Sequence, residues 1–255
     1  MNKKMLFIAA VLVLFGAGIC YAQDVGGGVR MPIPKITFDI KEAAGPRDVA
    51  LSLQILFLLT ILTLAPAIIM MMTAFTRVVI VMDFIKRALS LQQMPPNQII
   101  IGFSLFLTFF IMAPTFTKIN DEALQPYMKG KIDNEAFFNK GMEPLRVFMF
   151  KQTREKDIAL FIKLAKLPKP KNQKDVPTYC LVPAFMISEL KRAFEIGVLI
   201  FIPFIVIDMI VASALMAMGM IMLPPVMISL PFKIILFILV DGWNLLTYEL
   251  VRSFK

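Results

Sequence analysis

The chain has 255 residues, 58% apolar and 18% charged, and its 27 Lys and Arg against 18 Asp and Glu give a net charge of +9. This composition is too apolar for an ordinary soluble domain and argues against soluble enzyme folds. The chain has no His, the commonest general base and metal ligand. Any catalysis would therefore have to rest on carboxylates or lysine, and we expect no metal or other cofactor and no nucleic-acid partner.

Residues 1–22 have the pattern of a secretory signal peptide. Lys3 and Lys4 precede a short apolar run, and Ala22 ends a small-residue cleavage site. The alternative is an uncleaved anchor helix, although the run is short for a membrane span. Residues 23–48 contain three consecutive glycines and predict a flexible extracytoplasmic arm. Cleavage would leave Cys180 as the lone cysteine, so no intrachain disulfide is expected.

Four apolar blocks follow, at residues 51–72, 99–116, 196–218 and 226–248. Each is about long enough to cross a bilayer as a helix. The blocks predict an all-α membrane protein with four hydrophobic helical segments. Residues 49–113 would hold the first two membrane helices with their connector, and residues 189–255 the last two.

Residues 114–188 predict a small helical insert. Apolar residues at 158, 161, 162 and 165 recur at helical spacing, and Pro144 suits a first helical position. Thr178 or Pro183 is expected to start the helix that leads into the third block. The insert is basic, which suits either anionic headgroups or an acidic partner, or else reflects an ordinary solvated helical surface.

Basic residues in the connector between the first two blocks set the predicted orientation. Arg77, Lys86 and Arg87 lie there, and the positive-inside rule assigns their loop to the cytoplasm. The insert would then be periplasmic. Asp83 lies four residues before Arg87, which predicts a surface salt bridge without chemistry.

Methionines recur at every second residue around a break between the third and fourth blocks: Met216, Met218, Met220 and Met222. Gly219, Pro224 and Pro225 predict that this break is a non-helical hairpin. An extended loop would project all four thioethers to one side as a soft, adaptable lip, as a gate for diverse polypeptides requires. Two alternatives are gap-filling in helix packing and a copper(I) relay.

Three ionisable residues fall inside the apolar blocks: Asp208, Lys233 and Asp241. Charges at membrane depth are costly, so they are candidates for function, with a proton relay as one hypothesis. The other is simple pairing, for example with Lys233, or exposure to a water-filled cavity. Glu189 and Glu195 are six residues apart, which predicts different helix faces and argues against a carboxylate pair.

Several strings of sequence are similar to one known family. They are residues 72–81 (MTAFTRVVIV), 96–102 (PNQIIIG), 105–112 (LFLTFFIM), 201–204 (FIPF), 219–225 (GMIMLPP), 230–233 (LPFK) and 241–243 (DGW). In order and spacing they closely resemble the FliP family of type III secretion export-gate proteins. The resemblance covers about residues 48 to 255.

The resemblance implies a non-enzymatic subunit of a helical ring. Chains of this family assemble as a pentamer with FliQ and FliR into an export gate, through which unfolded flagellar subunits pass with the help of FlhA and FlhB. The family's methionine gasket corresponds to Met218, Met220 and Met222, with Met216 nearby. The implied location is the flagellar basal body in the bacterial inner membrane. From the residues alone, a proton-coupled or copper transporter remains the alternative.

Overall fold

The computed structural model describes residues 46–91, 94–220 and 223–254. The predicted signal peptide and most of the predicted arm lie outside these residues. Residues 1–51 and 52–255 separate into two units, and the second is described below. Among the described residues the regular structure is entirely helical, which confirms the predicted all-α fold.

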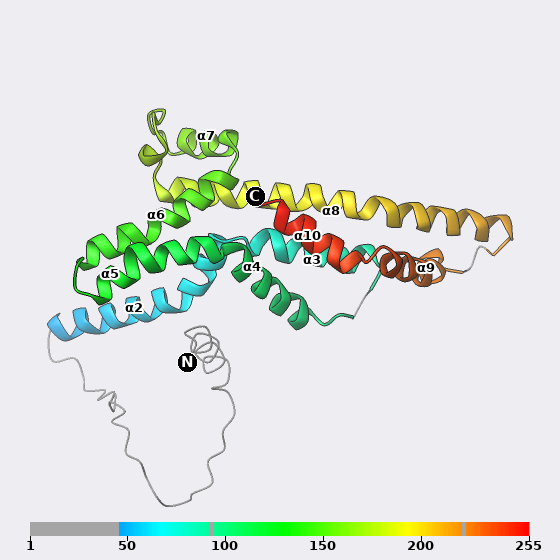
Figure 1. Ribbon diagram of the computed structural model, residues 1–255, viewed down its shortest axis with the longest axis horizontal. Helices are drawn as coiled ribbons and strands as arrows, with labels where there is room; N and C mark the ends of the chain where they lie inside the picture. The colour runs from blue at the N-terminus through cyan, green and yellow to red at the C-terminus, as the bar shows by residue number, and fades with distance from the viewer. Residues whose placement is uncertain (1–45, 92–93, 221–222, 255) are drawn as a thin grey trace, which may run out of the picture. The chain divides into compact units, whose positions relative to one another are not determined.

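The helices are shown in Figure 1. In chain order they are α2 (Pro46–Met71), α3 (Phe75–Ala88), α4 (Asn97–Ile119), the π-helical turn η1 (Asn120–Leu124), α5 (Gln125–Met128), α6 (Asn134–Gln152), α7 (Glu155–Leu164), the 3-10 turn η2 (Gln173–Asp175), α8 (Thr178–Ala217), α9 (Pro225–Leu239) and α10 (Gly242–Arg252).

Three helical stretches are long and apolar enough to cross a membrane: Leu53–Met71, Asn97–Met128 and Thr178–Ala217. They overlap the first three predicted segments, and the chain is a membrane protein by its apolar helix lengths. The fourth predicted segment is not one helix, because α9 and α10 meet at an angle of 65°. At this corner Asp241 adopts a left-handed conformation (φ 49°), and a Cβ on Gly242 would lie 2.3 Å from the Phe237 ring.

The predicted connector between the first two segments contains a helix, α3, which packs along α8. Val78, Val81 and Ile85 form the buried side of α3. The two helices approach closely at Gly197, where a Cβ would lie 2.5 Å from the Phe84 ring. Val78, Val81 and Ile85 belong to the larger of the two cores in the described chain.

Within the predicted insert, residues 114–188, the helices α6 and α7 pack on α8. Their shared core contains Met149, Ile162 and Phe185. Of the two predicted starts, Thr178 begins α8, and Pro183 lies inside the helix. The prediction that Pro144 begins a helix is wrong, because α6 starts ten residues earlier and is capped by Asp133, which accepts a hydrogen bond from the Ala136 amide (2.9 Å).

Candidate functional site

Residues 216–225, which join α8 to α9, are called the methionine junction below. Helix α8 ends there with a hydrogen-bonded cap. The Met220 amide donates to the Leu215 carbonyl, and the Gly219 amide donates to the Met216 carbonyl, both at 3.0 Å. Gly219 has φ +73°, which glycine adopts without steric cost. This pair of bonds is the Schellman motif, so Gly219 is the residue at which the chain leaves α8.

The described methionines of this junction are exposed: Met216 at 63%, Met218 at 61% and Met220 at 48%. Met222 lies outside the described residues. The extended conformation predicted for the run is wrong up to Gly219, because Met216 is helical and Met218 ends the helix. The thioethers of Met216 and Met218 therefore lie around the end of a helix. Their spacing of two residues does not reflect an extended segment.

The predicted non-helical break is confirmed at its described positions. Pro224 precedes the first turn of α9, and Pro225 is its first residue, where the missing amide hydrogen costs nothing. Gly219 ends one helix and two prolines start the next. Met216 therefore lies in the last turn of α8, and Met218 and Met220 lie on the short connection to α9.

A buried lysine joins α9 to α8 and α3. Lys233 is 2% exposed, and its Nζ lies 2.6 Å from Asp208 Oδ2. The same ammonium donates to Ser90 Oγ (2.8 Å) and to the Ala88 carbonyl (3.3 Å) at the end of α3. Ser229, one turn before Lys233, donates to Asp208 Oδ1 at 2.5 Å. The structure thus shows that Asp208 and Lys233 form an ion pair.

Asp241 lies apart from this pair, in the corner between α9 and α10, and its side chain is exposed. The sequence prediction put Asp241 inside the fourth segment, whereas the helix is interrupted there. Its backbone carbonyl accepts from the Leu245 amide at 3.1 Å. Two residues further on, the Trp243 ring packs edge-on against the Phe237 ring, with 5.3 Å between the ring centroids.

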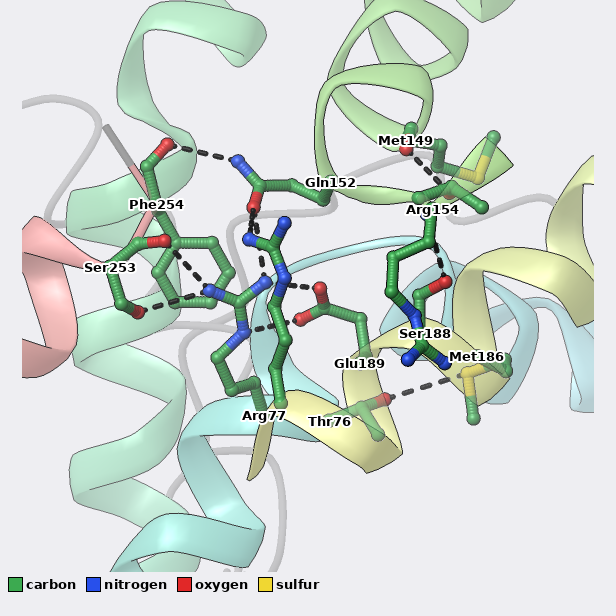
Figure 2. A network of polar contacts seen from close by, with 12 residues as sticks. Thr76, Arg77, Met149, Gln152, Arg154, Met186, Ser188, Glu189, Ser253 and Phe254 are labelled. Carbon is green, nitrogen blue, oxygen red and sulfur yellow. Dashed lines mark hydrogen bonds and ion pairs between the residues drawn. The ribbon is translucent and has the colours of Figure 1, made fainter. Parts of the chain in front are cut away.

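A second buried charge network surrounds Arg77, and sequence reasoning missed it (Figure 2). Arg77 is fully buried, and its Nε donates to Glu189 Oε2 at 2.9 Å, while its Nη2 pairs with the other carboxylate oxygen. Its Nη1 donates to the Ser253 carbonyl (2.9 Å), and Nη2 donates to Gln152 Oε1 (3.0 Å). The Phe254 ring covers the guanidinium at 3.8 Å. One side chain therefore ties α3 to α6, α8 and the C-terminal residues.

The surroundings of Arg77 shift its pKa. Burial lowers the pKa of the guanidinium from its ordinary value, and the hydrogen bond and charge of Glu189 oppose that shift. Arg192 acts in the same direction as burial, since it carries a like charge, and its Nη1 shares Gln152 Oε1 with Arg77 (3.0 Å). Arginine nevertheless stays protonated in proteins, so the Arg77–Glu189 contact is an ion pair.

The Arg77 contact contradicts one part of the predicted topology. Arg77 was assigned to a cytoplasmic connector and Gln152 to a periplasmic insert, yet their side chains are hydrogen-bonded at 3.0 Å. A bilayer core is about 30 Å thick, so these two groups lie on the same side. The positive-inside argument fails at Arg77 because that charge is buried and neutralised. The predicted surface pair is confirmed, with Arg87 Nε 2.6 Å from Asp83 Oδ2.

Sequence signals for the Arg77 network were weak. Arg77 is the sole charge in an apolar string, which marks it as expensive to bury unless paired. Its partner Glu189 is 112 residues away, so no local spacing identifies it. The prediction that Glu189 and Glu195 do not form a carboxylate pair is confirmed, because Glu189 is buried while Glu195 contacts Lys191 at the surface (3.3 Å).

A smaller polar cluster joins α7 to α8. Asp157 is 6% exposed and accepts hydrogen bonds from Ser188 Oγ (2.5 Å) and Arg154 Nε (2.8 Å). Burial alone would raise the pKa of the Asp157 carboxyl, but these hydrogen bonds and the nearby positive charge outweigh burial and lower the pKa below its ordinary value.

Replacing Asp157 by asparagine is expected to lower the free energy of unfolding at pH 7 by about 1–2 kcal/mol, since charge-assisted bonds are lost. A lowered folded-state pKa stabilises the fold above the unfolded pKa of about 4, and that contribution is lost as pH falls through the folded value. The difference in melting temperature between wild type and Asp157→Asn should therefore hold from pH 7 to about pH 5 and shrink below about pH 4. The exposed Asp83→Asn variant is the control. A difference that grows on acidification would contradict this assignment.

Known proteins resemble this chain over most of its length. The family model described as FliP family matches residues 58–250. The flagellar biosynthetic protein FliP of Bacillus subtilis is 56% identical over 216 residues, covering 85% of this chain and 98% of that protein. The FliP proteins of Treponema pallidum (52%, covering 92% of each chain) and Aquifex aeolicus (45%, covering 97% and 99%) are also similar.

The matched region runs from α2 to α10 and includes the methionine junction, the Asp208–Lys233 pair and the Arg77–Glu189 pair. Identity of about half, over nearly the full length of both partners, is far beyond what a shared helical architecture alone would produce. The chain therefore belongs to the FliP family.

Proposed function

We propose that this chain is a core subunit of the flagellar type III protein export gate, and that it is not an enzyme. The proposal rests on membership of the FliP family, whose relatives are named flagellar biosynthetic proteins. In this proposal it forms a ring, a pentamer, with FliQ and FliR in the bacterial inner membrane. FlhA and FlhB cooperate with the ring, and unfolded flagellar subunits pass through it.

The gate is proposed to be the methionine junction between α8 and α9. The observation that supports it is the exposure of Met216, Met218 and Met220 beside a helix cap. Exposed thioethers are flexible and polarisable, so copies of the loop meeting on a ring axis can close against one another. The same flexibility lets them adapt to many polypeptide sequences.

The insert is proposed to be periplasmic, as the family resemblance implies. Because Gln152 of the insert contacts Arg77, the start of α3 is then on the same side. The long apolar helices would pack on one another and on neighbouring subunits in the ring, as well as on lipid. Exposed apolar side chains such as Phe106 (76%) and Leu239 (77%) are consistent with such coverage.

Changing Met218, Met220 and Met222 together to alanine is expected to make cells leak while export continues. Alanine removes the flexible side chains that block the pore but leaves its helical wall. Uptake of a small membrane-impermeant solute should rise several-fold, and filament growth should persist. The control replaces Met94, Met128 and Met209, which are also exposed but lie away from the junction. If the junction variant stays as tight as wild type, the gasket assignment fails.

The transporter alternative has a different signature. A proton-coupled carrier would use Asp208 as a titrating group, and a copper carrier would use the methionines. In the structure Asp208 is engaged by Lys233 and Ser229, which suits a structural pair better. Native mass spectrometry of the chain, alone and with FliQ and FliR, decides between them. About five copies without copper supports the gate, a metal-free monomer in both preparations supports the proton-coupled carrier, and a copper-loaded species supports the copper carrier.

A further inference from the structure

The surface formed by the end of α7 and the loop to α8 is strongly basic. Between residues 163 and 174 there are five lysines and no acidic residue: Lys163, Lys166, Lys169, Lys171 and Lys174. All five are exposed. This charge does not take part in the Arg77 network, the Asp208–Lys233 pair or the methionine junction. We call these five lysines the basic surface.

Two exposed leucines lie beside the basic surface. Leu160 and Leu164 are 45% and 66% exposed. They are one turn apart on α7, so they share one face of the helix with exposed Lys156, one turn before Leu160. The buried face of α7 carries Asp157 and Ile162. The outward face thus combines apolar and basic side chains, the composition of helices that lie on membrane interfaces.

The loop that carries the basic surface is held in a defined place. Arg146 of α6 donates to the carbonyls of Gln173 (3.2 Å) and Val176 (2.7 Å). Asp175, the acidic residue that follows the run, turns back to accept from the amides of Lys171 (3.1 Å) and Asn172 (3.0 Å). Its carboxylate is therefore already satisfied by the loop's own backbone.

We propose that the basic surface, with Leu160 and Leu164, binds the headgroups of anionic phospholipids such as phosphatidylglycerol. Clustered lysines are attracted to an anionic surface, each strengthening binding about fivefold. Exposed leucines beside them insert at the boundary between headgroups and acyl chains. A lipid surface matches this arrangement, because all five lysines are exposed and their charges are spread over residues 163–174.

The test uses the full chain, purified in a neutral detergent with equal amounts of phosphatidylglycerol and phosphatidylcholine, and counts retained lipids by native mass spectrometry. Wild type should favour phosphatidylglycerol by at least about tenfold. Replacing the five lysines of the basic surface by glutamine should abolish most of this preference. Leu160→Ser with Leu164→Ser should weaken retention of phosphatidylglycerol while keeping the charge, so a misfolded lysine variant would not leave the proposal untested.

A matched control replaces five other exposed lysines of the insert by glutamine: Lys118, Lys129, Lys131, Lys140 and Lys151. This variant has the same net charge as the basic-surface variant and should keep the lipid preference. The proposal is overturned if the control loses the preference equally, or if wild type has none. Tight binding of polyglutamate by wild type without phosphatidylglycerol retention would assign the surface to an acidic protein instead.

Discussion

Replacing Arg77 by alanine is expected to lower the free energy of unfolding by about 3–5 kcal/mol, the cost of leaving one member of a buried ion pair alone. Both side chains of the Arg77–Glu189 pair are fully buried. The substitution also removes the hydrogen bonds that Arg77 donates to Gln152 and to the Ser253 carbonyl. It removes the cation that lies on the Phe254 ring as well. Thermal or denaturant unfolding of the purified protein in detergent measures the loss.

A surface pair provides the control for Arg77. Arg87 contacts Asp83 at 2.6 Å, but the Arg87 side chain is 70% exposed. Arg87→Ala should therefore cost less than about 1 kcal/mol. Arg77→Lys should remain clearly destabilising, because an ammonium cannot reproduce the two-pronged contact with Glu189. Equal losses for Arg77→Ala and Arg87→Ala would show that the buried network contributes little.

The double variant Arg77→Met with Glu189→Leu distinguishes the attraction between the two charges from the cost of burying one charge alone. Removing both charges leaves no unpaired ion, so this variant should be more stable than Arg77→Ala. If the double variant were instead the least stable of the set, the network would contribute through its hydrogen bonds to Gln152 and the C-terminal residues. Comparing the double variant with Arg77→Ala therefore identifies which part of the network stabilises the fold.

Asp208→Asn is expected to be the second large change, lowering the free energy of unfolding by about 2–4 kcal/mol. Asparagine keeps the shape of the side chain but removes the counter-charge of an ammonium that is 2% exposed. Lys233 would then face only neutral acceptors, namely the new amide oxygen at position 208, Ser90 Oγ and the Ala88 carbonyl. Unfolding of the detergent-purified protein measures this effect too.

Lys233→Met should cost less than Asp208→Asn. The Asp208 side chain is 30% exposed and keeps its bond from Ser229, so its charge stays partly solvated. Methionine also fills the space of the lysine stem without a charge. The reverse order would mean that the bonds from Lys233 to the end of α3 matter more than the charge balance.

The Asp208–Lys233 pair also bears on the gate. Ser229 and Lys233 are one turn apart on α9, so both face Asp208 of α8, and α9 starts directly after the methionine junction. Loss of the pair would remove the ionic link between α9 and α8. We expect Asp208→Asn to impair filament growth as well as stability, in contrast to the methionine variant, which should leak while growth persists.

Local patterns in the sequence were enough for the helical class, three of the four long apolar segments, and the break near Gly219 and Pro224. Each depends on neighbouring residues: apolar length sets a span, glycine ends a helix, and proline starts one. The same logic correctly paired Asp83 with Arg87, four residues apart on one helix.

Only the tertiary structure determined the partners of the buried charges. Arg77 meets Glu189 across 112 residues, and Lys233 reaches Ser90 across 143. No spacing rule covers such distances, since the partners are chosen by how α3, α8 and α9 pack. The fourth apolar block likewise reads as continuous in the sequence, because its apolar composition does not indicate the left-handed residue Asp241 at which α9 and α10 bend apart. A buried charge is stable only beside its counter-charge, so the fold and not the local sequence determines its role.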